Sequence, residues 1–181
     1  MDKNKVKSVL EWPIPRNIRE LQSFLGLCNF YRKFIKNFAK DMEPLRKLLK
    51  KDNPFIWDYD TDYAFKKLKN AFNTDEVLIF PDPDKEFIVE SDASDFAISC
   101  VLSQKSDKDN SLHSVAFHSR SLNQTEINYT IYDKELLAII TAFEVWRHHL
   151  EGARFPVQVL TDHKNLLYFK KPQHLNQRQI R

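Results

Sequence analysis

Three carboxylates stand at places where this sequence could do chemistry. Asp92 follows an alternating run that begins at Phe87 and is typical of a strand, and Asp162 follows a second such run. Glu135 lies in an early turn of a long expected helix. Carboxylate oxygens are hard ligands, and three of them without a Cys or His cluster favour Mg²⁺ or Mn²⁺ over Zn²⁺. A pair of such ions, about 4 Å apart, can support in-line hydrolysis of a phosphodiester.

Each carboxylate also has a plainer interpretation. Asp92 and Asp95 suit a hairpin turn, because Asp side chains bond to nearby backbone. Glu135 falls on the apolar stripe of its helix, whereas Glu144 falls on the opposite side. A carboxylate on that stripe must be paired, protonated or bound to a cation, unless it lies at the stripe's edge and reaches water. If the strands before Asp92 and Asp162 are parallel neighbours, both aspartates emerge at one edge of the sheet.

The elements that would hold these residues follow one another as three strands, a helix and a fourth strand. Residues 121–126 are expected to form a loop before the helix, and Gly152 to close the helix in the C-cap position. This order predicts an α/β fold with a mixed sheet packed by helices. The strands are expected near 86–92, 97–102, 113–119 and 155–162, and the helix near 131–150.

The chain before the sheet is expected to be helical. An extended arm at residues 1–15 would lead into a helix, which Asn17 caps and Glu20 supports from three residues further on. Asp60 or Thr61 would cap a later helix. Cations around the first of these helices indicate either a solvated face or a surface that lies along a phosphate backbone. These cations include Arg19, Arg32, Lys33 and Lys36.

Composition narrows the class of protein. The 181 residues are 42% hydrophobic, enough to bury a core, and the net charge of +3 does not by itself demand a nucleic-acid partner. Cys28 and Cys100 lie in apolar runs and are interpreted as buried hydrophobes, which suits a reducing compartment. No apolar run approaches the length of a membrane span, and the start lacks an apolar signal core. We therefore expect an intracellular protein with no membrane partner.

Several motifs together resemble the RNase H domain of gypsy-type LTR retrotransposon Pol polyproteins. They are FIVESDASD at 87–95, VLSQ at 101–104, YDKELLA at 132–138, WRHHL at 146–150 and TDHKNL at 161–166. Upstream motifs are similar to the reverse transcriptase thumb and linker that follow the polymerase palm. They are RELQSFLGL at 19–27, NFYRKFI at 29–35 and PLRKLLKKD at 44–52. The resemblance covers nearly the whole chain.

The resemblance implies a helical thumb and linker at residues 1–80, followed by an RNase H-like domain at 81–181. It implies an endonuclease that cuts the RNA strand of an RNA–DNA hybrid with two Mg²⁺ or Mn²⁺ ions. Asp92, Glu135 and Asp162 match the family's first three metal-binding carboxylates. The implied partners are the hybrid or a template–primer duplex and the rest of a Pol polyprotein, including palm and integrase. The implied location is a cytoplasmic virus-like particle or the nucleus.

The sequence also departs from the family. The family carries a further strand and a final helix with a fourth metal-site aspartate, and this chain stops at Arg181 before either. We therefore expect a C-terminally truncated domain with weak or absent activity. Ser99 stands where members usually carry Gly. The alternative function is a non-catalytic, connection-like module that binds the duplex, although a pure scaffold has no need for three convergent carboxylates.

Overall fold

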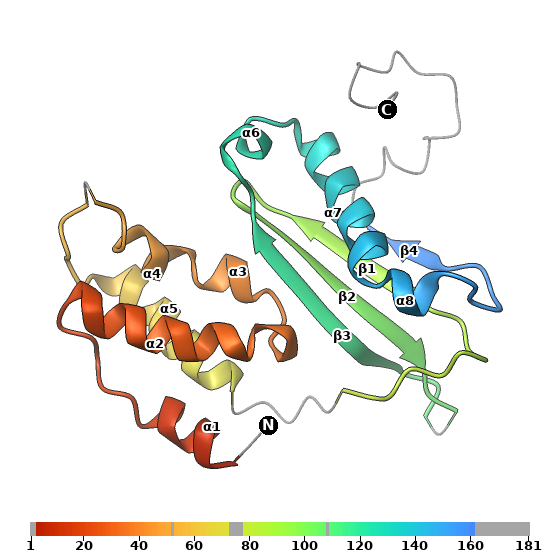
Figure 1. Ribbon diagram of the computed structural model, residues 1–181, viewed down its shortest axis with the longest axis horizontal. Helices are drawn as coiled ribbons and strands as arrows, with labels where there is room; N and C mark the ends of the chain where they lie inside the picture. Colours follow the sequence, from red (N-terminus) through yellow and green to blue (C-terminus); the bar gives the residue numbers. More distant parts are fainter. Residues whose placement is uncertain (1–2, 52, 73–77, 108, 162–181) are drawn as a thin grey trace.

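The computed structural model describes residues 3–51, 53–72, 78–107 and 109–161 of the chain. Helices gather on one side of the molecule, and a sheet with its own helices lies on the other (Figure 1). Each side buries its own group of apolar side chains. The helical group includes Leu21, Phe24 and Phe65, and the sheet group includes Val89 and Leu102.

The sheet has four strands in the order β3-β2-β1-β4. The first three strands pair in antiparallel fashion, and β4 pairs in parallel with β1, as expected if a helix crosses over between them. The α/β fold with a mixed sheet is therefore confirmed. The fourth strand is much shorter than the expected run. The strands are β1 (Ile88–Ala93), β2 (Ala97–Lys105), β3 (Leu112–Ser121) and β4 (Gln158–Leu160).

The long helix α7 (Ile131–Val145) lies across β1 and β2 (Figure 1). Its Ala138 and Ala142 are completely buried and pack in one group with Val89 of β1. A single residue separates α7 from a short turn of helix, α8 (Arg147–Leu150). Gly152, which follows α8, lies in the left-handed region at a φ of 78°. The expected single helix is thus two, and a glycine tolerates the conformation that follows them.

Three local expectations were wrong. Residues 121–126 do not form a plain loop, because Asn123 and Glu126 make a capping box that starts the short helix α6 (Gln124–Ile127). The expected arm at 1–15 contains the helix α1 (Lys3–Leu10). Asp58, rather than Asp60 or Thr61, caps α5, since its carboxylate accepts from the Thr61 backbone N–H at 2.8 Å.

The predicted cap of the helix that follows α1 is confirmed. The Asn17 side chain accepts from the Glu20 N–H at 3.0 Å and starts α2. The helical run is interrupted after α2, and Asn37 adopts a left-handed φ of 57°. These breaks separate the remaining elements: α2 (Ile18–Phe30), η1 (Arg32–Phe34), α3 (Phe38–Asp41), α4 (Glu43–Lys47) and α5 (Tyr59–Ala71).

The two sides of the molecule meet where η1 and α3 pack against the sheet, mainly against β3. The backbone N–H of Ala39, a donor in the first turn of α3, donates to Ser119 Oγ at 3.0 Å. This bond is buried and joins residues 80 positions apart in sequence. Arg46 of α4 donates a second bond to the Ser121 hydroxyl. Two serines of β3 thereby fix the position of α3 and α4 on the sheet.

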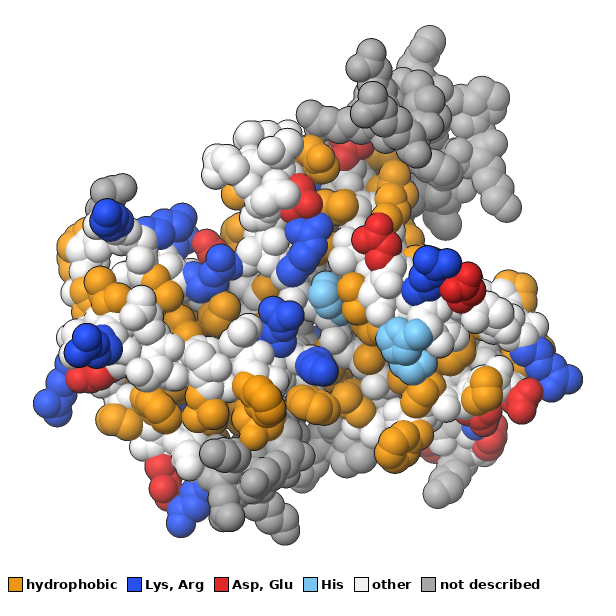
Figure 2. All heavy atoms as spheres, in the orientation of Figure 1, with side chains coloured by type: hydrophobic (Ala, Val, Ile, Leu, Met, Phe, Trp, Pro, Cys, Tyr) orange, Lys and Arg blue, Asp and Glu red, His pale blue; other side chains and the backbone are white. Residues whose placement is uncertain are grey.

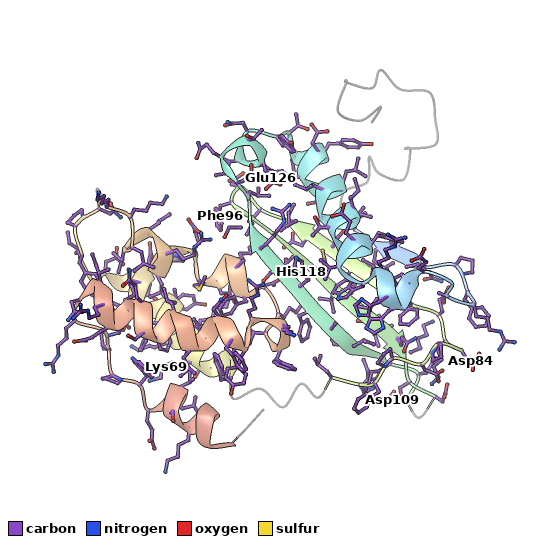
Figure 3. All side chains as sticks on the ribbon, viewed as in Figure 1. Lys69, Asp84, Phe96, Asp109, His118 and Glu126 are labelled. Atoms are coloured by element: carbon purple, nitrogen blue, oxygen red, sulfur yellow. The ribbon has the colours of Figure 1, made fainter. Side chains whose placement is uncertain are left out.

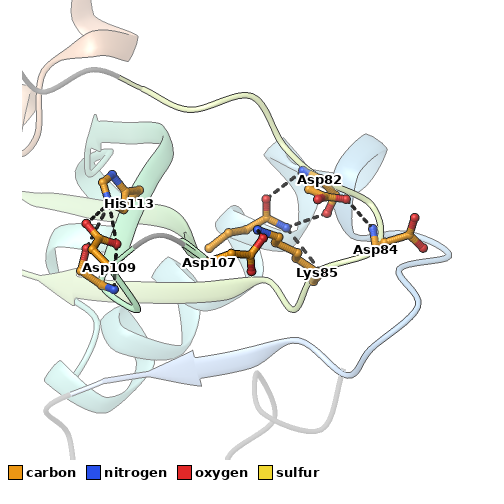
Figure 4. A network of polar contacts seen from close by, with 8 residues as sticks. Asp82, Asp84, Lys85, Asp107, Asp109 and His113 are labelled. Carbon is orange, nitrogen blue, oxygen red and sulfur yellow. Dashed lines mark hydrogen bonds and ion pairs between the residues drawn. The ribbon is translucent and has the colours of Figure 1, made fainter.

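Side chains near the start of β1 fix the segment that precedes this strand. Gln104 of β2 is completely buried, and its amide binds both backbone groups of Asp82, at 2.9 Å and 2.8 Å. Lys85 forms an ion pair with Asp107 in the loop after β2, and His113 contacts Asp109 in that loop (Figure 4). These contacts hold the start of β1 in register with β2.

Candidate active site

Asp92 lies one residue before the end of β1, opposite Ser99 of β2. Side chains alternate along a strand, so Asp92 faces away from the layer that Val89 forms with α7. About half of its side chain, 46%, is exposed. The turn that follows is closed by Ser94, whose N–H and hydroxyl both donate to the Ala97 carbonyl. A rigid strand end therefore presents a solvent-accessible carboxylate.

Glu135 reaches the same strand end from α7. It is only 3% exposed, which confirms its expected place on the buried stripe, and Glu144 is exposed as expected. The backbone N–H of Ala93 donates to Glu135 Oε1 at 3.2 Å. Glu135 therefore contacts the backbone of the residue that follows Asp92, although 43 positions separate the two acidic residues in sequence.

The charges of both carboxylates affect the pKa of the Cys100 thiol. Burial first, and then the negative charges of Glu135 and Asp92, raise the pKa of this thiol to about 12, and Arg120 opposes them. Cys100 Sγ donates to the Ala138 carbonyl at 3.2 Å. The neutral thiol is therefore part of the core under the site, as the sequence predicted, and it offers no thiolate to a metal ion.

The third predicted carboxylate, Asp162, lies outside the described residues. The register that leads toward it is described: β4 runs parallel to β1 and pairs Leu160 with Glu90. This pairing confirms that the first and fourth strands are parallel neighbours. Within residues 3–51, 53–72, 78–107 and 109–161, no group of three or more His, Cys, Asp or Glu side chains could hold a metal ion. The described part of the site supplies two hard-oxygen groups, which fit part of a Mg²⁺ site.

Two lysines at the site were missed by the sequence analysis. Lys40 of α3 places its ammonium 3.3 Å from Asp92 Oδ2, and both side chains are nearly half exposed. Lys134 of α7 has only 7% of its side chain exposed and donates to the Asp95 carbonyl at 3.3 Å. No sequence signal connects Lys40 with Asp92, because their contact depends on how the helical part docks on the sheet. Lys134 could have been found from the sequence, because it lies next to Glu135 in the early turns of the long expected helix.

The predicted nucleic-acid contacts are all exposed on the helical part. Arg19 lies on α2, Arg32 and Lys33 lie on η1, and Lys36 follows η1. Figure 2 shows Lys and Arg side chains gathered where this part meets the sheet. His118, labelled in Figure 3, lies on β3 at this junction. Burial first, and then the charges of Arg32 and Arg120, lower the pKa of His118.

Comparison with known proteins places this fold in a family. Residues 57–157 match the family described as the RNase H-like domain found in reverse transcriptase. The Transposon Tf2-3 and Tf2-4 polyproteins of Schizosaccharomyces pombe are each 40% identical to this chain over 162 residues, which is 90% of the chain. The chain spans only 12% of the length of these relatives.

Solved structures share the fold. A foamy viral protease-reverse transcriptase in complex with RNA/DNA hybrid superposes with a TM-score of 0.70, at 22% identity, over 99% of this chain and 25% of that one. The same protein in complex with dsDNA gives a TM-score of 0.71, at 22% identity, over 96% of this chain and 36% of that one. In the part of the chain that the structure describes, no helix has the length and apolar character needed to cross a membrane.

Proposed function

This chain belongs to the family of RNase H-like domains found in reverse transcriptase, as part of a retrotransposon polyprotein, and from that premise we propose that it hydrolyses the RNA strand of an RNA–DNA hybrid. The observation that carries the proposal is the 3.2 Å bond from the Ala93 N–H to Glu135, which brings a buried carboxylate to the residue after Asp92. A bound cation would favour the ionised form of a carboxylate that is buried this deeply.

Asp92, Glu135 and Asp162 are the residues proposed to hold divalent metal, with Mg²⁺ as the ion that suits their hard oxygens best. RNase H-like domains generally use divalent ions, and a bound pair supplies an activated water and a stabilised leaving oxygen. The Ala93 N–H orients Glu135, so that this carboxylate keeps one geometry. The exposed carboxylate of Asp92 is the group that a phosphodiester can approach from solvent.

Recognition of the hybrid is proposed to rest on phosphate contacts from Arg19, Arg32, Lys33 and Lys36, and on the 2′-hydroxyls of the RNA strand. We also propose that residues 1–80 are the thumb and linker region and that residues 81–181 are the RNase H-like domain. Two separate groups of buried side chains support this division, although the family match begins at residue 57, before the sheet.

A single-turnover assay with excess protein tests the proposed function. A hybrid labelled on its RNA strand is incubated with Mg²⁺ or EDTA, and Asp92→Asn and Glu135→Gln are compared with Glu144→Gln, the exposed glutamate on the other side of the same helix. We expect weak metal-dependent cleavage that both site variants lower further by at least about tenfold, because even indirect partners of metal ligands cost that much. Cleavage that survives in Asp92→Asn, or no cleavage by any form, would contradict the proposal.

A further inference from the structure

The segment between α2 and α3 presents two aromatic rings to solvent. Phe30 is 73% exposed and Phe34 is 43% exposed, and we call them the exposed aromatic pair. Single exposed apolar side chains are common, but a phenyl ring this exposed gains little from folding. Two of them four residues apart, on either side of one tyrosine, are a feature that the packing of the helical part does not explain.

The tyrosine between them holds both rings in place. Tyr31 packs edge-on against the buried ring of Phe72, with centroids 5.8 Å apart, and is thereby attached to the helical core. Phe30 lies edge-on to Tyr31 at 5.0 Å, and Phe34 lies 6.5 Å from Tyr31 on a tilted plane. The exposed aromatic pair therefore contacts a common, core-bound ring, and little conformational entropy remains to be lost when a ligand binds it.

The chain segment that carries the pair has charge of a single sign. No acidic residue occurs between Glu20 and Asp41, whereas the same stretch carries exposed cations. Figure 2 shows hydrophobic and Lys or Arg side chains side by side on this face, over the end of α2 beside the sheet. The cations are Arg32, Lys33, Lys36 and Lys40.

We propose that this segment binds single-stranded nucleic acid, with unpaired bases stacked on Phe30 and Phe34 and the adjoining phosphates held by Arg32 and Lys33. Ring faces stack on any base, and neighbouring cations follow the backbone, which is the usual composition of a single-strand site. The inference rests on the proposed function, which brings nucleic acid to this protein.

A single strand suits these groups better than the alternatives do. In a duplex the base faces are already stacked on one another, so phenyl rings would meet only the sugar–phosphate surface and gain less. A protein partner for an apolar patch on a segment that carries cations and no acidic residue would need matching acidic groups of its own. A single strand offers unstacked apolar bases and negative phosphates at the spacing of consecutive nucleotides.

The test is a binding titration on the full chain carrying Asp92→Asn, in EDTA, so that neither metal nor cleavage enters. The probe is a single-stranded oligonucleotide containing 2-aminopurine, whose fluorescence is quenched when the base stacks. We expect the Phe30→Leu and Phe34→Leu variants to bind about tenfold more weakly each, with less quenching, because leucine keeps an apolar side chain but has no ring face. Their dependence of affinity on salt should match that of the unsubstituted protein.

The charged side chains should show the reverse signature. Lys33→Ala is expected to lower the slope of log affinity against log salt by about 0.7, the value for one phosphate contact on a single strand. The control is Phe80→Leu, since Phe80 is 95% exposed but precedes the acidic stretch Asp82–Asp84, and this variant should bind normally.

Three results would overturn the inference: normal binding by both leucine variants at Phe30 and Phe34, an equal loss in Phe80→Leu, or the same loss of affinity for a matched duplex in the two leucine variants. Each of these can occur while the hybrid-cleavage assay succeeds. Conversely, a chain without nuclease activity can still show the predicted stacking signature, so the two proposals fail separately.

Discussion

Replacing Ser119 by alanine removes the oxygen that joins the two parts of the molecule. The Ala39 N–H then loses its acceptor, the Ser119 hydroxyl oxygen at 3.0 Å. Water does not readily replace it, because Ala39 and Ser119 are only 4% and 8% exposed. The first N–H groups of a helix have no partner inside the helix, and Asn37 makes no side-chain cap here. A buried donor left without an acceptor costs about 1–3 kcal/mol, so Ser119→Ala should lower the free energy of unfolding by that amount.

Urea denaturation at neutral pH measures this loss, and hydrogen exchange of the Ala39 amide locates it. Ser23→Ala is the matched control, because the Ser23 hydroxyl donates to the Arg19 carbonyl on an exposed helix face and its loss should change stability by less than about 0.5 kcal/mol. Equal stability of the two variants, together with unchanged protection of the Ala39 amide, would refute the view that Ser119 holds α3 on the sheet.

Two further predictions concern charges at this junction. The Lys40→Met variant should bind Mn²⁺ more tightly than the unsubstituted chain by up to about fivefold, because an exposed ion pair worth about 0.2–1 kcal/mol no longer competes for Asp92. Calorimetric titration checks this, and Lys67→Met, which removes a different surface pair, should bind normally. The pKa of His118 should lie below its ordinary value of 6.5, so that below pH 6.5 the unfolded chain binds more protons than the folded chain. The free energy of unfolding should therefore fall as the pH drops below 6.5. An NMR titration checks this pKa, which Arg32→Ala should raise.

Local sequence signals predicted the sheet and its helix well. Period-two alternation located the first three strands, and the stripe on α7 separated buried Glu135 from exposed Glu144. Parallel pairing of the first and fourth strands followed from the order of elements. These features are predictable because they depend on residues close together in the chain or on general rules of connection.

Features set by docking between distant segments were not predictable. The Lys40–Asp92 pair and the bond from Ala39 to Ser119 join segments 52 and 80 positions apart. Nothing in either segment marks its partner. Short capping choices also failed, as at Asp58, because several Asp and Thr residues near the start of α5 can each accept a backbone N–H and only the packing of the helix selects one.

Mn²⁺ titration calorimetry of the full chain tests most directly whether the carboxylates at the end of β1 form a metal site. Asp92→Asn and Glu135→Gln should each weaken Mn²⁺ binding by at least about tenfold, because each removes a charged ligand while keeping the shape of the side chain. Glu144→Gln should leave the affinity unchanged, since Glu144 is exposed on the far side of α7. Equal affinity in the unsubstituted chain and all three variants would contradict the account.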